Sequence, residues 1–118
     1  MSAIADAAVM LETALKGMDG VRAYRDPGAN LQCPAAVLGP PALTWETGCV
    51  GPTSARFLVY AVVDADERAV EKLWDLVDQV ANAIDATDAV VVHADPAVYT
   101  SGTRQLPCYE ITTEVGLA

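Results

Sequence analysis

The sequence predicts one α/β domain of the α+β type over residues 1–118, with a mixed β-sheet of about five to six strands backed by two helices on one face. Residues 56–63 form a nearly continuous apolar run, which is typical of a strand near the centre of a sheet. Residues 3–16 and 64–84 each repeat apolar side chains at the spacing of a helix with one buried face. At 118 residues and 53% hydrophobic content, the chain can bury one core without metals or disulfides.

The first helix is predicted over residues 3–16. Ser2 suits its N-cap, because a serine hydroxyl can accept a hydrogen bond from a backbone N–H that the first turn leaves free. Gly17 suits its C-terminal end. The stripe that faces the core consists of Ile4, Ala8, Leu11 and Leu15.

Short strands are predicted next over residues 21–24, 34–38 and 43–46, the last as a strand or a sheet edge. Residues 26–30 contain Asp, Pro, Gly and Asn, which favour a loop between the first two strands. Gly39–Pro41 is expected to end the second strand, because proline cannot donate to a sheet ladder.

The second helix is predicted to follow the strand at 56–63 directly. Asp64 is expected to cap it, and Glu67 three residues later completes a capping-box pattern. We expect Trp74, on the flank of the apolar stripe, to pack into the core. The stripe comprises Val70, Leu73, Val77, Val80, Ala81 and Ile84, with Trp74 and Leu76 on its two sides.

The C-terminal part is predicted to contain two strands, over residues 89–94 and 106–115. Residues 95–105 between them include Pro, Gly, Ser and Thr, so a long loop is expected there. Within 106–115 apolar and polar residues alternate, which predicts one buried face and one wet face. The expected element order is αββββαββ.

The charge balance excludes some functions. Sixteen acidic residues against seven basic ones give a net charge of −9, so wrapping around nucleic acid is not expected. We also expect no secretory signal and no membrane-spanning segment. The three cysteines fit no metal motif, and reduced thiols are the expected state, with a single disulfide as the alternative.

The sequence contains few residues that could act together in catalysis. The single histidine, His93, would need an orienting partner and a nucleophile to act as a general base. No motif links it to the available nucleophiles, which are Ser54, Ser101 and Cys108. A structural or surface role is therefore expected for His93, and we predict no catalytic residue and no enzyme activity.

Two segments resemble ion sites only in composition. Asp64, Asp66, Glu67 and Glu71 could offer oxygen ligands to a hard cation, but acidic residues also favour the N-terminal end of a helix without any metal. The glycines of residues 48–52 do not lead into a helix, so they do not form a phosphate site. We therefore predict no metal site and no cofactor.

The candidate functional residues are consequently those that could meet a partner. Tryptophans anchor interfaces as well as cores, and arginines beside loops could pair with carboxylates of a neighbouring copy of an acidic protein. The candidate interface residues are Arg25, Asp26, Trp45, Thr100 and Arg104.

The layout of the chain resembles a known family. The segments that carry the resemblance are Val21–Ala29, Pro34–Pro41, Leu43–Glu46, Gly51–Tyr60 leading into Ala65–Arg68, and Leu106–Thr112. With this layout, which covers nearly the whole chain, the protein resembles the tail terminator proteins of long-tailed (siphovirus) bacteriophages, of the actinobacterial phage type. The resemblance rests on overall layout and carries no catalytic signature.

The resemblance implies a small structural protein, six copies of which close into a ring on the end of the tail tube. Such a ring stops the addition of tube subunits and offers a joining surface to the head-neck connector protein, while DNA passes through its lumen without specific binding. It also implies assembly in the host cytoplasm and a place at the head-proximal end of the virion tail. Two alternatives stay open, namely another head-tail connector or neck protein, and a small cytoplasmic ligand-binding domain or enzyme.

Overall fold

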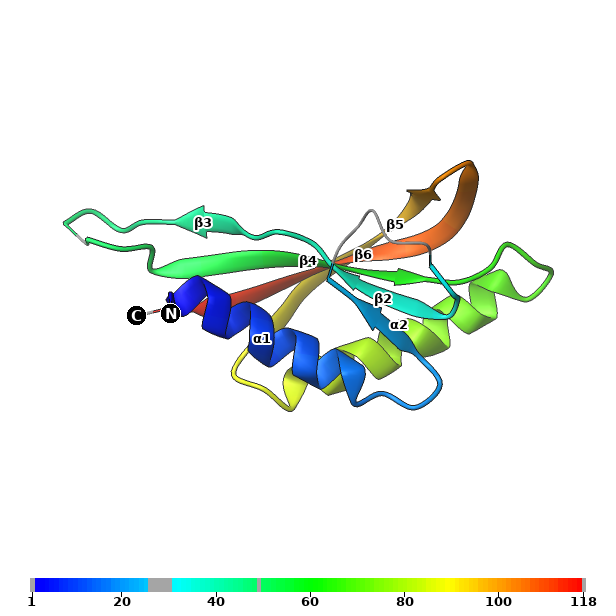
Figure 1. Cartoon of the computed structure of the whole chain (residues 1–118), viewed down its shortest axis with the longest axis horizontal. Helices are drawn as coiled ribbons and strands as arrows, with labels where there is room; N and C mark the ends of the chain where they lie inside the picture. Colours follow the sequence, from blue (N-terminus) through cyan, green and yellow to red (C-terminus); the bar gives the residue numbers. More distant parts are fainter. Residues whose placement is uncertain (1, 26–30, 49, 118) are drawn as a thin grey trace.

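The computed structural model describes residues 2–25, 31–48 and 50–117, and its elements follow the expected order αββββαββ (Figure 1). The elements are α1 (Ala3–Lys16), β1 (Arg22–Tyr24), β2 (Ala35–Leu38), β3 (Ala42–Thr44), β4 (Ser54–Val62), α2 (Ala69–Asp85), β5 (Val90–Ser101) and β6 (Arg104–Gly116). The predicted first helix and the cap at Ser2 are confirmed, because the Ser2 Oγ accepts a hydrogen bond from the Ala5 N–H at 3.0 Å. No helix in the described part of the chain is long and apolar enough to cross a membrane.

The sheet is mixed, and β4 lies at its centre as predicted. The strand order is β1-β2-β4-β6-β5, and β3 pairs with the first part of β4. Strands β1 and β2 are parallel, whereas every other pair is antiparallel. Phe57, Val59 and Ala61 of β4 pack into the main core, and Tyr60 and Val62 pack on the other face, which explains the apolar sequence of this strand.

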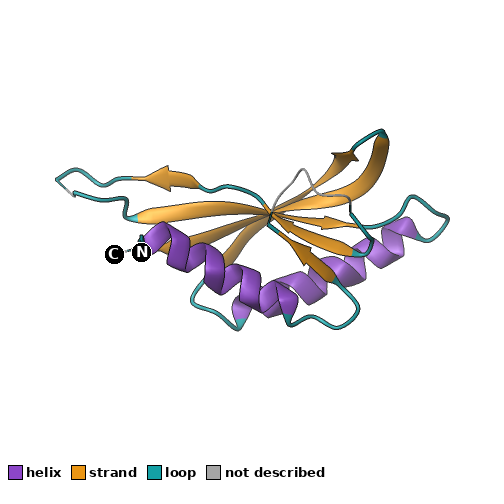
Figure 2. Ribbon diagram, in the orientation of Figure 1, coloured by secondary structure: helices purple, strands orange, loops and turns teal. Residues whose placement is uncertain are grey.

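Both helices cover the same face of the sheet, as predicted (Figure 2). Leu11 and Leu15 of α1 pack with Val80 and Ile84 of α2 against alternate side chains of β4, such as Phe57. The opposite face carries a second, smaller apolar cluster. It consists of Leu31, Ala35, Val37, Val62, Tyr99, Leu106 and Cys108.

The start of α2 differs from the prediction. The helix begins at Ala69 with Arg68 at the N-cap position and no side-chain cap, so Asp64 does not cap it. The chain needs residues 63–68 to pass from the sheet to the helix layer, and there Asp66 accepts a hydrogen bond from the Arg68 N–H at 2.9 Å. The helix therefore starts one turn later than its acidic residues suggest.

The side chains on the flanks of α2 also differ from the prediction. Trp74 is 57% exposed and so does not pack into the core, and Val70 is exposed to the same extent. Leu76, on the other flank, is buried instead. The buried face of the helix is thus rotated toward α1, which leaves Val70 and Trp74 uncovered.

The long loop predicted over residues 95–105 does not exist. Those residues extend β5 and begin β6, and Gly102, with a φ of 62°, allows the tight turn between the two strands. Pro96 suggested a strand break, but β5 is an edge strand, where a residue without an N–H is tolerated. The alternation predicted for the last strand holds in its later part, where Ile111, Thr113 and Val115 are buried. It is wrong at the start of the strand, because Leu106 and Cys108 on the predicted wet face are buried in the second apolar cluster.

Candidate functional site

The loop between β3 and β4 projects beyond the end of the sheet (Figure 1). Its base is closed where the Thr53 N–H and hydroxyl both donate to the Thr44 carbonyl, at 2.7 and 3.1 Å. Trp45, the first residue beyond β3, is 54% exposed, and Val50 further along is fully exposed. An exposed indole on a projecting loop is well placed to enter a pocket on a partner.

An apolar groove of about 600 Å³ lies between the first half of α1 and the end of β2. Gly39 allows a close approach of two strands beside the groove. There the Gly39 N–H donates to the Leu58 carbonyl at 2.8 Å, and an added Cβ would lie 3.3 Å from that carbonyl oxygen. The apolar side chains that line the groove are Ile4, Ala5, Ala8, Leu38, Pro40, Pro41 and Phe57.

Arg25, one of the predicted interface residues, lies at the groove. Its Nε is 4.0 Å from a carboxylate oxygen of Glu12, and its side chain is 49% exposed. An exposed pair at that distance contributes little, so the guanidinium stays available for a closer partner. Asp26, the neighbouring candidate, lies outside the described residues.

Thr100 and Arg104 lie at the turn of the β5–β6 hairpin. Thr100 is exposed and stands opposite Gln105 in the strand register. Arg104 uses its guanidinium within the chain, since its Nη2 is 3.0 Å from the Asp64 carboxylate and its Nη1 donates to the Leu31 carbonyl at 3.4 Å. The structure therefore places these two candidates on a strand hairpin, away from the groove that Arg25 borders.

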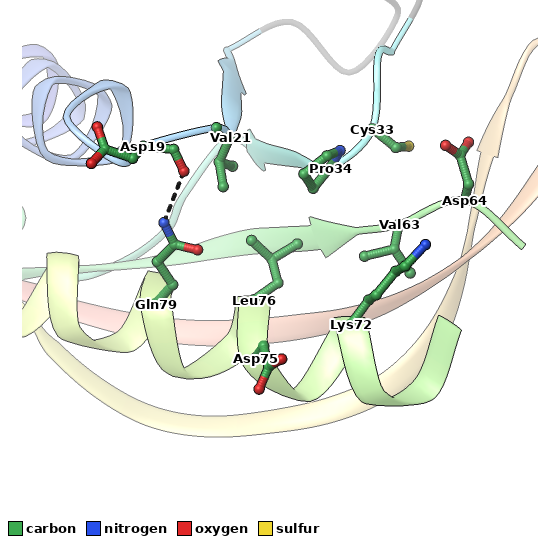
Figure 3. A pocket seen from close by; sticks show the side chains of 11 residues that line it. Asp19, Val21, Cys33, Pro34, Val63, Asp64, Lys72, Asp75, Leu76 and Gln79 are labelled. Carbon is green, nitrogen blue, oxygen red and sulfur yellow. Dashed lines mark hydrogen bonds between the residues drawn. The ribbon is translucent and has the colours of Figure 1, made fainter. Parts of the chain in front are cut away.

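A second cleft, of about 400 Å³, lies between α2 and the turn that follows α1 (Figure 3). Val21, Val63 and Leu76 form its apolar floor, and the Gln79 amide donates to the Asp19 carbonyl at 3.2 Å on one side. The other polar lining residues are Cys33, Asp64, Lys72 and Asp75. Its volume and mixed lining would suit a small organic molecule.

The two cysteines within the described residues, Cys33 and Cys108, form no disulfide, and Cys49 lies outside those residues. Burial, with the nearby Asp64 carboxylate, raises the pKa of the Cys33 thiol above its ordinary value. Burial, with Glu110, raises the pKa of Cys108 to about 11. Both thiols are therefore protonated near neutral pH, which makes them weak nucleophiles.

The residues considered for catalysis or metal binding form ion pairs within the chain. His93 is exposed on β5, and its Nε2 lies 3.0 Å from the Asp95 carboxylate. Asp66, in the acidic segment before α2, is bound by Lys72 at 2.7 Å, which lowers the pKa of its carboxyl group. Among the described residues, no three His, Cys, Asp or Glu side chains are grouped as a metal site requires.

The outer face of α2 is a surface that the sequence pattern did not reveal. Val70 and Trp74 lie one turn apart and are both exposed, beside an outward row of carboxylates. The carboxylates belong to Glu71, Asp75, Asp78 and Asp85. The apolar groove was also missed, because α1, β2, β4 and the residues that follow β1 and β2 all contribute to it and no local pattern links them.

The chain matches no protein-family model, and no curated protein sequence is significantly similar to it.

Proposed function

We propose that this protein is a structural assembly subunit that closes into a ring on the end of a bacteriophage tail tube. In this role it stops tube elongation and offers a joining surface to the head-neck connector. The observation that carries the proposal is the exposed Trp45 on a loop that projects from the sheet. The resemblance of the sequence to tail terminator proteins supplies the tube as the partner.

The shape of the subunit supports a head-to-tail assembly. A ring requires two different patches on each copy, because a heterologous contact joins one patch to the other. The subunit is elongated, with extents of 51 × 28 × 23 Å. It carries an exposed indole on the β3–β4 loop and, on other elements, the apolar groove beside α1, so two different patches are available.

The distribution of charge supports passage of DNA without binding. Six of the seven basic side chains pair with carboxylates of the same chain, so the charge left over on the surface is mainly acidic. These six are Lys16, Arg25, Arg56, Arg68, Lys72 and Arg104. An acidic ring would repel phosphate and let DNA move through its lumen.

Negative-stain electron microscopy of the purified protein, with and without tail tubes, tests this function. We expect rings of about one tube diameter, or caps on tube ends that arrest elongation in a tube-assembly reaction. Tubes that grow to the same length with and without the protein, and bear no caps, would overturn the proposal. Binding to the connector side of a finished neck alone would favour a neck protein instead.

The cleft of Figure 3 favours a second candidate, a small ligand-binding domain. Its apolar side chains and the Asp64 carboxylate would suit a compact cation with an apolar body. Amide chemical shifts measured during a titration with a library of small organic amines test this candidate. Shifts clustered at Gly20, Val21 and Leu76 would support it, whereas shifts scattered over the acidic surface would exclude it.

A further inference from the structure

We propose that Trp45 and Glu46 of one copy dock into the apolar groove of a second copy, where Arg25 of the second copy pairs with Glu46. This inference rests on the proposed ring and names the contact that would build it. The occupant of the groove is therefore a segment of another copy of this protein.

The groove has the composition of a docking site for a large apolar side chain. Its volume is about 600 Å³, and seven of its lining residues are apolar. Phe57 lines the groove and is also buried in the main core. The bottom of the groove is therefore continuous with that core. A tryptophan that enters such a site removes a large apolar area from water, which favours binding.

The loop between β3 and β4 presents a suitable occupant. Trp45 directly follows β3, whose pairing with β4 fixes the base of the loop through the Thr44 and Thr53 bonds. A loop whose base is fixed loses less conformational freedom when it docks than a free one. Glu46 is the only charged residue between Trp45 and Thr53, so insertion of the loop would bury few charges.

The charges of the two surfaces are complementary. Among the described residues, Arg25 is the only charged one that lines the groove, and it gives the groove a basic group in a protein of net charge −9. Glu46 is exposed and forms no ion pair with the described part of the chain. A docked Trp45 would bring the adjacent Glu46 toward Arg25, whose present partner Glu12 is 4.0 Å away. The groove with Arg25 and the loop with Trp45 and Glu46 both belong to this chain. The occupant of the groove is therefore a second copy of the protein.

Sedimentation velocity of the whole chain, at one fixed ionic strength, tests the contact. Trp45→Ala should weaken self-association by about tenfold or more, as expected when an interface loses an aromatic anchor. Trp74→Ala is the matched control, because the two tryptophans are 54% and 57% exposed, and it should leave self-association within about twofold of wild type. Both side chains are exposed, so neither change should prevent folding.

Exchange of the two charges gives an independent test. Arg25→Glu and Glu46→Arg should each weaken self-association, and the double variant should restore it because the charges are then reversed together. Arg22→Glu is the control, since Arg22 is also exposed but does not line the groove. Failure of the double variant to recover association would overturn the pairing of Glu46 with Arg25.

The outcomes separate this contact from the ring itself. If rings form but Trp45→Ala and Arg25→Glu leave them intact, the contact is overturned and the proposed function survives. If only a two-subunit particle forms and Trp45→Ala abolishes it, the contact is supported and the ring is overturned. A protein that stays monomeric at ~1 mM in high salt and forms no caps on tube ends would overturn both.

Discussion

The Arg104 guanidinium and the Asp64 carboxylate lie 3.0 Å apart and join the turn of the β5–β6 hairpin to the end of β4. The same guanidinium also donates to the Leu31 carbonyl, so three separate segments meet at one side chain. Arg104 and Asp64 are 50% and 59% exposed, and water and salt therefore screen their attraction. The contact orients the hairpin more than it stabilises the fold.

Arg104→Gln should lower the free energy of unfolding by less than ~1 kcal/mol, because an exposed ion pair contributes little. Urea denaturation followed by circular dichroism measures the change. Asp64→Asn should have a similar effect, and the double variant should lose little more than either single one. A loss above ~2 kcal/mol for Arg104→Gln would show that the hairpin depends on this side chain.

Leu73 and Trp74 are neighbours in α2 with opposite environments. Leu73 is 5% exposed, so Leu73→Ala should lower the free energy of unfolding by about 2–5 kcal/mol through lost burial and a residual cavity. Trp74→Ala removes a larger side chain but should cost less than ~1 kcal/mol, because that side chain lies mostly in water. Chemical denaturation of both variants checks the orientation of the helix. Equal losses would mean that Trp74 is packed.

The buried thiol of Cys108 should make stability depend on alkaline pH. Its pKa rises from 9.0 to about 11 on folding, because burial and Glu110 disfavour the thiolate. The unfolded chain therefore binds fewer protons than the folded one in that interval. The contribution of this thiol is complete below pH 9 and is lost as the pH rises toward about 11.

Urea denaturation at pH 8 and at pH 11 measures this effect. Cys108→Ala is the control, because it removes the thiol while other titrating groups remain. The decrease in the free energy of unfolding between the two pH values should be smaller in Cys108→Ala than in wild type. An equal decrease would show that the thiol is not responsible.

Self-association should increase with salt. Copies with a net charge of −9 repel one another, and the repulsion between exposed charges falls as the Debye length shrinks to ~3 Å at 1 M salt. Sedimentation velocity at low and high salt measures the change. The double variant Asp75→Asn, Asp78→Asn should associate more at low salt, because it carries two fewer negative charges and leaves the groove intact. A sedimentation pattern that does not change with salt would show that charge repulsion does not limit self-association.

The parts of the fold that local patterns describe could be predicted from the sequence. The helix Ala3–Lys16 carries its cap and its stripe within its own residues, and β4 carries its burial in its apolar run. The start of α2 could not be predicted in this way. Asp64 looked like a cap, but its carboxylate binds Arg104, which lies 40 residues further along the chain.

The candidate site also depends on contacts between residues that lie far apart in the sequence. Trp45 was a candidate interface residue because it stands in a short predicted strand beside loops, and the structure places it just beyond that strand and exposes it. The groove was not predictable, because Ala8, Leu38 and Phe57 meet only once the sheet has formed. The extended β5 was missed because Pro96 reads as a strand break, although at a sheet edge a missing N–H costs no ladder bond.

The β5 edge has a consequence for how copies of the protein can meet. Pro96 offers no N–H to another strand, and the register is irregular between Val91 and His93. An edge with a missing donor and an irregular spacing is a poor template for strand addition. Neighbouring sheets are thereby hindered from fusing into a continuous ribbon that would grow without limit. For the tube-capping role proposed above, Pro96 and the irregular register would therefore limit unwanted growth through this edge.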